Sequence, residues 1–143
     1  MPYKFLEEVA LADIAFRAEG SSLEEVFAAA SDATMNVMVD NLDSIQAKER
    51  RALVLENSAL DLLLFDLLQE LIYFKDSEQL LLRVYQLSIR QEGALWKLTG
   101  EARGEKLDPA RHRQRADVKA VTLHHFKLEK TDAGWTAMVV LDI

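Results

Sequence analysis

The segment that most constrains the fold is residues 135–143, which read Trp-Thr-Ala-Met-Val-Val-Leu-Asp-Ile. In a β-strand successive side chains point to opposite faces of the sheet, and here apolar side chains occupy both the odd and the even positions. Such a strand needs a cover on each face and is poorly suited to an edge, where charge or proline normally blocks further pairing. We therefore expect an interior strand, with the terminal carboxylate held in place within a sheet.

The sequence before this segment switches between the periodicities of strands and helices. Residues 12–19 alternate between apolar and polar side chains, as a half-buried strand does. From residue 21 the apolar spacing becomes helical, and Ser21 and Ser22 each precede a glutamate by three residues, which is the capping-box pattern. In chain order, the expected elements are strands at 3–9 and 12–19, a helix at 21–40, a strand at 52–57 and a helix at 58–74. They are followed by a hairpin of 79–93 with 94–107, a helical turn at 108–112, and a hairpin of 118–130 with 135–143.

This order of elements predicts an α+β fold, in which a mixed or antiparallel sheet packs against two long helices. With 143 residues, half of them apolar, the chain has the size and composition of one domain, spanning residues 1–143. No apolar stretch approaches the ~20 residues that a membrane-spanning helix requires, and the first ten residues lack the features of a signal peptide. The chain has no cysteine for disulfides or thiolate metal sites. We therefore expect a cytoplasmic protein that does not bind membranes.

The charge balance argues against direct binding to nucleic acid. Asp and Glu number 24 and Lys and Arg number 17, giving a formal net charge of −7. Nucleic-acid binding usually depends on a basic patch that neutralises phosphates. The basic residues here are scattered, with small clusters at 48–51 and 111–115, which we interpret as solvated turns or strand ends. A role beside an RNA-binding partner stays compatible with this composition.

The sequence is poorly equipped for catalysis. It contains no G-x-G-x-x-G, P-loop, H-E-x-x-H or G-x-S-x-G motif. With no cysteine and three histidines, nucleophilic triads have few candidate members. We therefore expect no catalytic residues and no site for an organic cofactor.

Acidic groups near the two ends of the sequence are the main candidates for a functional site. Asp13 lies on the polar face of an early strand, and Asp142 ends the expected interior strand one step before the carboxylate of Ile143. Held in a sheet, these negative groups would repel unless a proton or a cation bridged them. Carboxylate oxygens suit calcium, magnesium or manganese rather than zinc. On composition alone, the favoured interpretation is a solvated Asp142 at a strand end and an Asp13 that pairs with Arg17 or a nearby cation.

The histidines and one lysine are further candidates for a functional site. His124 and His125 are consecutive in an expected strand, so they should point to opposite faces and should not chelate one metal together. We expect one packed, hydrogen-bonded histidine and one exposed. Lys119 could contact an anion, but a solvated side chain is the simpler reading.

Several short segments, taken in order, resemble the archease family over essentially the whole chain. No single segment is decisive, but their order and spacing make the resemblance specific. They are ADIAFRAEGSSLEEVF (12–27), NVMVD (36–40), LLLFDLLQELIYFKD (62–76), GEKLDPARH (104–112), VKAVTLH (118–124) and LDI (141–143).

This resemblance implies an α+β fold and a non-enzymatic role. Members of the family act as protein cofactors of the RNA ligase that joins 3′-phosphate or 2′,3′-cyclic phosphate ends to 5′-hydroxyl ends in tRNA splicing and RNA repair. They promote attachment of guanylate to the ligase and allow multiple turnover. The family's metal site matches Asp13, Asp142 and, through its main-chain oxygens, Ile143. The implied ion is divalent, most often calcium.

One departure from the family pattern affects the first of these segments. Family members commonly carry histidine and threonine where this chain has Ala10 and Leu11, although Asp13 is kept. If the two missing side chains support the metal ligands through hydrogen bonds, this chain binds its ion more weakly or differently.

Two other functions stay open from the sequence. The first is a metal-dependent hydrolase, in which Asp13 and Asp142 activate water. This reading lacks an evident general base. The second is a general chaperone or small-ligand binding module, whose activity would not depend on a metal.

Overall fold

The computed structural model describes residues 2–6 and 13–143, which form two antiparallel sheets and two long helices. The first sheet has the strand order β1-β2-β7-β6, and the second has the order β3-β5-β4. The strands and helices are β1 (Tyr3–Phe5), β2 (Asp13–Gly20), α1 (Leu23–Met38), a 3₁₀ turn (Leu42–Ser44), β3 (Glu49–Asn57), α2 (Leu60–Glu78), β4 (Leu80–Glu92), β5 (Leu95–Lys106), β6 (Ala120–Thr131) and β7 (Gly134–Asp142).

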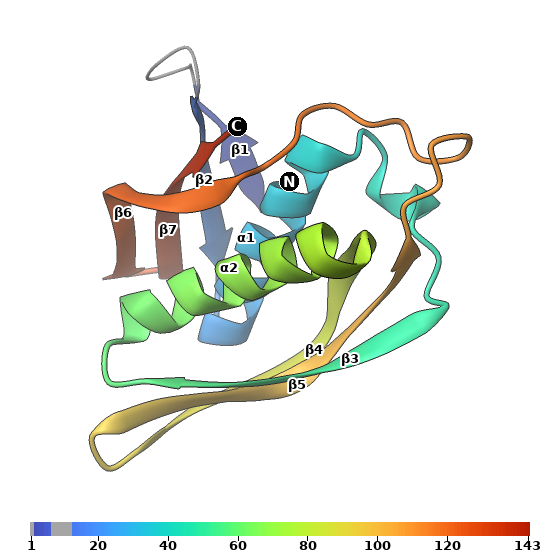
Figure 1. The fold of residues 1–143 in the computed structure, drawn as a ribbon. Helices are drawn as coiled ribbons and strands as arrows, with labels where there is room; N and C mark the ends of the chain where they lie inside the picture. Colours follow the sequence, from blue (N-terminus) through green and yellow to red (C-terminus); the bar gives the residue numbers. More distant parts are fainter. Residues whose placement is uncertain (1, 7–12) are drawn as a thin grey trace.

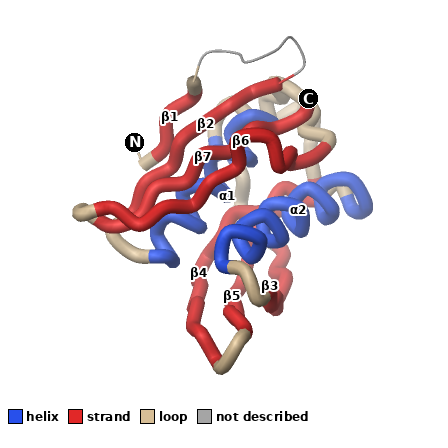
Figure 2. The backbone as a smooth tube through the Cα atoms, turned by 90° about the vertical axis from the view of Figure 1, so that its left-hand side faces the viewer, coloured by secondary structure: helices blue, strands red, loops and turns tan. Residues whose placement is uncertain are grey.

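The helices lie between the two sheets, as Figures 1 and 2 show. Helix α1 contacts β2 and β7 of the first sheet and β4 of the second, while α2 contacts β6 on one side and the second sheet on the other. The two helices therefore share one apolar core with the inner faces of both sheets. The predicted α+β class with two long helices is confirmed, although the strands form two sheets where we expected one.

Helix α1 begins where the sequence indicates. The hydroxyl of Ser22 is the N-cap and accepts a hydrogen bond from the backbone N–H of Glu25 at 3.1 Å. The Glu25 carboxylate in turn accepts hydrogen bonds from the backbone N–H and the hydroxyl of Ser21. The bond to Ser22 satisfies one backbone donor that the first helical turn leaves unpaired, and the bonds from Ser21, the residue before the cap, hold the Glu25 side chain at the start of the helix. Most of α1 from Val26 onward is buried because the helix lies against both sheets.

Strand β7 is an interior strand, as its two apolar faces predict. It pairs with β2 on one side and with β6 on the other. Its inward-facing residues include Ala137, Val139 and Leu141, all of them buried in the common core. On the outer face Val140 is also fully buried, which explains why both faces of this strand are apolar.

A buried ionic network fixes the turn between β5 and β6. The carboxylate of Glu105, whose residue is only 3% exposed, accepts hydrogen bonds from the Gln46 backbone N–H at 2.7 Å and from the Arg111 guanidinium. His112 Nδ1 accepts from the backbone N–H of Asp108 at 2.8 Å, so Nε2 carries the proton and donates to Glu105 at 3.0 Å. These bonds, those from Arg111 foremost, lower the pKa of Glu105 to about 2 despite its burial. The predicted helical turn capped by Asp108 is confirmed.

Candidate functional site

Asp13 and Asp142 lie directly opposite each other at one end of the first sheet. They are register partners in the antiparallel pair of β2 and β7, and both are half-buried. Residues in such positions share one face of the sheet, with β-carbons about 4.5–5.5 Å apart. The fold therefore brings together two carboxylates that are far apart in the sequence. On the other side of Asp142 lies Ala120 of β6, which adds no charge to this row.

The end of β7 is held by both its main chain and its side chains. The backbone N–H of Lys119 donates to the carbonyl oxygen of Asp142 at 2.8 Å, which extends the pairing of β6 with β7. The side chain of Ile143 packs against the apolar core. Figure 1 shows this end of β7 beside the beginning of β2. Ile143, one residue beyond Asp142, therefore lies at the same end of the sheet as the two aspartates.

No cation among the described residues neutralises this pair. The ion pairs within 4.0 Å in residues 2–6 and 13–143 include neither Asp13 nor Asp142. Arg17 lies on the same face of β2 as Asp13. It is four residues further along the strand, so the two α-carbons are about 13 Å apart. The interpretation of Asp13 as the partner of Arg17 is therefore wrong.

The oxygens in this region suit a hard divalent cation. Two carboxylates and the main-chain oxygens of Ile143 are the ligand type that calcium, magnesium and manganese prefer. Thr122 of β6 pairs with Val140, two residues along β7 from Asp142, so it faces the same side of the sheet as Asp142. Its buried hydroxyl has no hydrogen-bond partner among the described residues. A buried hydroxyl without a partner costs free energy, and a water molecule of a bound ion would satisfy it. The residues therefore fit the implied ion.

Side chains alone do not complete a metal site here. Within the described ranges, no three His, Asp or Glu side chains gather closely enough to hold an ion. A site at Asp13 and Asp142 thus depends on main-chain oxygens and water for its remaining ligands. Ala10 and Leu11, which replace the family's histidine and threonine, lie outside the described residues.

The two consecutive histidines differ from the sequence expectation. His124 and His125 lie in an irregular stretch of β6, where the register jumps between Thr122 and Lys127, and His125 has a positive φ of 57°. The bulge rotates the second side chain back, so the two ring centroids are 4.0 Å apart and both residues are exposed. The predictions that they point to opposite faces and that one is packed are wrong. The side chain of Lys119 is exposed, as predicted.

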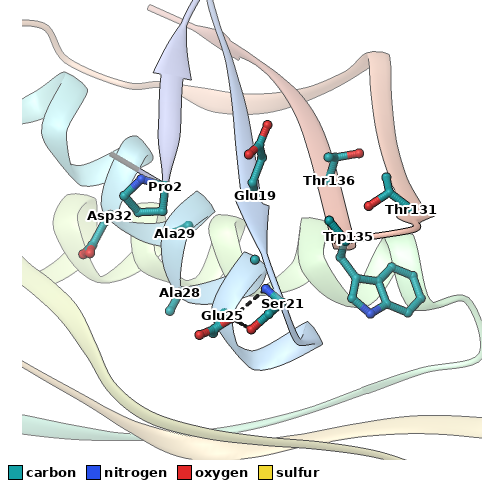
Figure 3. Close-up of a pocket in the computed structure, with 12 residues that line it drawn as sticks. Pro2, Glu19, Ser21, Glu25, Ala28, Ala29, Asp32, Thr131, Trp135 and Thr136 are labelled. Carbon is teal, nitrogen blue, oxygen red and sulfur yellow. Dashed lines mark hydrogen bonds between the residues drawn. The ribbon is translucent and has the colours of Figure 1, made fainter.

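A pocket that the sequence did not predict lies at the other end of the same sheet, and Figure 3 shows the residues around it. It has a volume of about 660 Å³. Four segments meet there: the residue before β1, the end of β2, one side of α1 and the turn between β6 and β7. None of these segments has a motif that marks a site, so no local sequence signal could have located the pocket. Gly20 and Trp135, which are paired in register, line it.

The fold resembles two solved structures. The solution structure of protein 1598 from Methanobacterium thermoautotrophicum superposes with a TM-score of 0.85 at 34% identity and covers 99% of each chain. A crystal structure from Thermotoga maritima, described as an archease and possible chaperone, gives a TM-score of 0.63. It covers 94% of this chain and 93% of that one, but at 21% identity this second likeness concerns the fold alone.

Sequence comparison leads to the same family. The chain is 41% identical to protein archease of Pyrococcus abyssi over 133 residues, which is 92% of this chain and 93% of the relative. It is 37% identical to protein archease of Methanosarcina mazei over 142 residues, covering 99% and 95%. The profile of the archease protein family matches residues 3–143. On these matches, the chain belongs to the archease protein family.

Proposed function

We propose that this chain is a cytoplasmic, non-enzymatic protein cofactor of a GTP-dependent RNA ligase that joins 3′-phosphate and 5′-hydroxyl ends. In this role it promotes guanylylation of the ligase and multiple turnover in tRNA splicing and RNA repair. A divalent ion, most often calcium, binds at Asp13, Asp142 and the main-chain oxygens of Ile143. Membership of the archease family supports the role, and the pairing of Asp13 with Asp142 supports the site.

The observation that carries the proposal is the row of two like charges. Like charges directly opposite in a β-sheet destabilise it, so a fold that keeps Asp13 and Asp142 in register needs a compensating interaction. A bound divalent ion supplies positive charge that offsets their repulsion. The packing of the Ile143 side chain against the core supports the proposal that its main-chain oxygens join the same site.

The surface charge is consistent with a basic protein partner. A net charge of −7 disfavours direct binding to RNA and favours a positively charged face of a ligase by electrostatic complementarity. A helix that could cross a membrane is absent from residues 2–6 and 13–143. The partner we propose is therefore a protein, with the RNA held by the ligase.

The two alternatives are less well supported by the site. A metal-dependent hydrolase needs a general base near the ion, and within the described part of the chain no third His, Asp or Glu joins Asp13 and Asp142. A general chaperone would not need the carboxylates at all. Replacement of one carboxylate therefore separates the chaperone from the proposal. The hydrolase would lose activity in the same variant, and it is separated by testing whether the chain alone hydrolyses phosphoesters.

The test is multiple-turnover ligation with purified ligase, GTP and RNA carrying 3′-phosphate and 5′-hydroxyl ends. The wild-type chain should increase the number of turnovers, and Asp142→Asn should reduce that stimulation by about tenfold or more, since loss of a supporting metal contact commonly costs 10–100-fold. The matched control is Glu129→Gln, which removes an exposed carboxylate from β6 of the same sheet. Equal stimulation by the wild-type and D142N chains, with both folded, would reject the proposed mechanism.

A further inference from the structure

The pocket between β2, α1 and the β6–β7 turn has an unusual set of ionisable side chains. Those that line it are Glu19, Glu25 and Asp32, and its other lining residues are small, aromatic or uncharged. No lysine, arginine or histidine is among the described residues that line it. Among the described residues, the ionisable side chains that line the pocket are therefore all acidic.

Two of these carboxylates are available to a ligand. Asp32 is already neutralised, since the Arg83 guanidinium donates to both of its oxygens at 3.1 Å. Glu25 accepts from Ser21, and these hydrogen bonds lower its pKa, so Glu25 keeps its negative charge at neutral pH. Glu19 takes part in no ion pair with another described residue.

An aromatic side chain and small apolar residues complete the pocket. Figure 3 shows Trp135 on the opposite side of the view from Asp32, with Glu19 and Glu25 between them. The face of an indole ring attracts cations, most strongly among the aromatic residues. Ala28 and Ala29 of α1 add apolar surface, against which the methylene groups of a long basic side chain can pack.

We propose that this pocket receives an arginine side chain of a protein partner. A planar guanidinium can stack on an aromatic ring while it donates to two separate carboxylates, which a lysine ammonium does less well. A volume of about 660 Å³ is larger than one side chain and accommodates the flanking main chain. A positively charged residue also complements the net charge of −7.

This pocket is separate from the proposed metal site. Gly20 pairs with Trp135 at one end of the β2–β7 ladder, and Asp13 pairs with Asp142 at the other. Seven residues of strand separate the two rows, which is about 23 Å. Loss of one site should therefore leave the other intact, and failure of this proposal does not affect the proposed ligase function.

Trp135 provides the readout for the test. The chain has two tryptophans, and Trp96→Phe leaves Trp135 as the only one. Into this variant we would titrate N-acetyl-arginine amide and, as an uncharged isostere, N-acetyl-citrulline amide. The arginine compound should change the Trp135 fluorescence saturably in the millimolar range, and the citrulline compound should not. The tripeptide acetyl-Gly-Arg-Gly-amide should bind at least as tightly as the single residue.

Substitutions of the two carboxylates locate the response. Glu19→Gln and Glu25→Gln, each in the W96F background, should weaken arginine binding about three- to fivefold, the range of a partly exposed charge pair. Glu56→Gln, which removes an exposed carboxylate from β3 of the other sheet, should leave it unchanged. The thermal transition of each variant shows that it is folded, and E19Q lies outside the α1 capping bonds.

Three results would overturn this proposal. The first is an equal fluorescence response to the arginine and citrulline compounds, or no response to either. The second is arginine binding that E19Q and E25Q both leave unchanged. The third is equal affinity for N-acetyl-lysine amide, which would exclude the guanidinium as the group that the pocket selects.

Discussion

At the scale of single residues, the pairing of Asp13 with Asp142 should destabilise the protein when no metal is bound. Like charges directly opposite in a sheet cost about 0.2–1 kcal/mol. Asp13→Asn should therefore raise the free energy of unfolding by that amount in the presence of a chelator. In saturating calcium the wild-type should instead be more stable than D13N, because an ion at 100 times its Kd stabilises the folded wild-type by about 2.7 kcal/mol. Thermal or urea unfolding with and without calcium measures both effects.

The control for this comparison is Glu129→Gln on β6 of the same sheet. In chelator, the free energy of unfolding of this variant should equal that of wild-type. Calcium should stabilise the variant as much as it stabilises wild-type. A D13N chain that is less stable than wild-type in chelator would indicate that Asp13 makes a favourable contact instead. That result contradicts the repulsion on which the site is argued.

The residues of the site were predictable from the sequence to different degrees. Asp142 could be singled out because it ends a strand that is apolar on both faces, and Asp13 because it lies at the beginning of an alternating strand. The pocket at Trp135 could not be predicted, because four segments from different parts of the sequence meet there. The orientation of His125 also could not, since a bulge and a positive φ depend on how β6 packs rather than on its alternation.

At the scale of elements, the Glu105 network should make the β5–β6 turn sensitive to acid. The folded-state pKa of about 2 lies below the unfolded value of about 4.3. Ionised Glu105 therefore contributes stability that is fully present above about pH 4.3 and is lost as the pH falls toward 2. Glu105→Gln should cost about 1–3 kcal/mol at pH 7, because the partners of a buried carboxylate are left poorly satisfied. The difference from wild-type, measured by urea unfolding, should shrink between pH 4.3 and pH 2.

The acid dependence has its own control in Glu101→Gln. Glu101 pairs with Arg103 on the same strand but is part-exposed, so its replacement should change stability little across this range. A difference between E105Q and wild-type that stays constant from pH 7 to pH 2 would contradict the assigned network.

The second sheet depends on a close approach at Gly104. A β-carbon at this position of β5 would overlap the carbonyl oxygen of Leu81 on β4, which is backbone and cannot rotate away. Gly104→Ala should therefore force the strands apart and cost about 1–3 kcal/mol. Thr99→Ala, at an exposed position of the same strand, should change stability by less than about 0.5 kcal/mol. Chemical denaturation of both variants checks this, and equal stabilities would show that β4 and β5 have room to separate.

The elements themselves follow closely from local patterns. The apolar spacing and capping serine predict α1, and the turn at Glu92 and Gly93 predicts the β4–β5 hairpin. The partition of the strands into two sheets was not predictable in this way. Both helices are apolar enough to be covered on two sides, but only their packing decides which strands lie on each side.

At the scale of the whole molecule, the topology places the beginning and the end of the chain side by side. β2 and β7 are neighbours in the first sheet although more than a hundred residues separate them. Any site built from Asp13 and Asp142 therefore exists only in the folded protein, and metal binding there is linked to folding. The pocket at Trp135 depends on the same two strands, at their opposite ends.

Calorimetric titration of calcium into the purified chain tests the central claim most directly. Wild-type protein is predicted to bind one calcium ion, and Asp13→Asn and Asp142→Asn should each weaken that binding by about tenfold or more, while Glu129→Gln leaves it unchanged. No calcium binding by the folded wild-type chain, or binding by D13N and D142N as tight as that of wild-type, would contradict the claim that these two carboxylates hold a divalent ion.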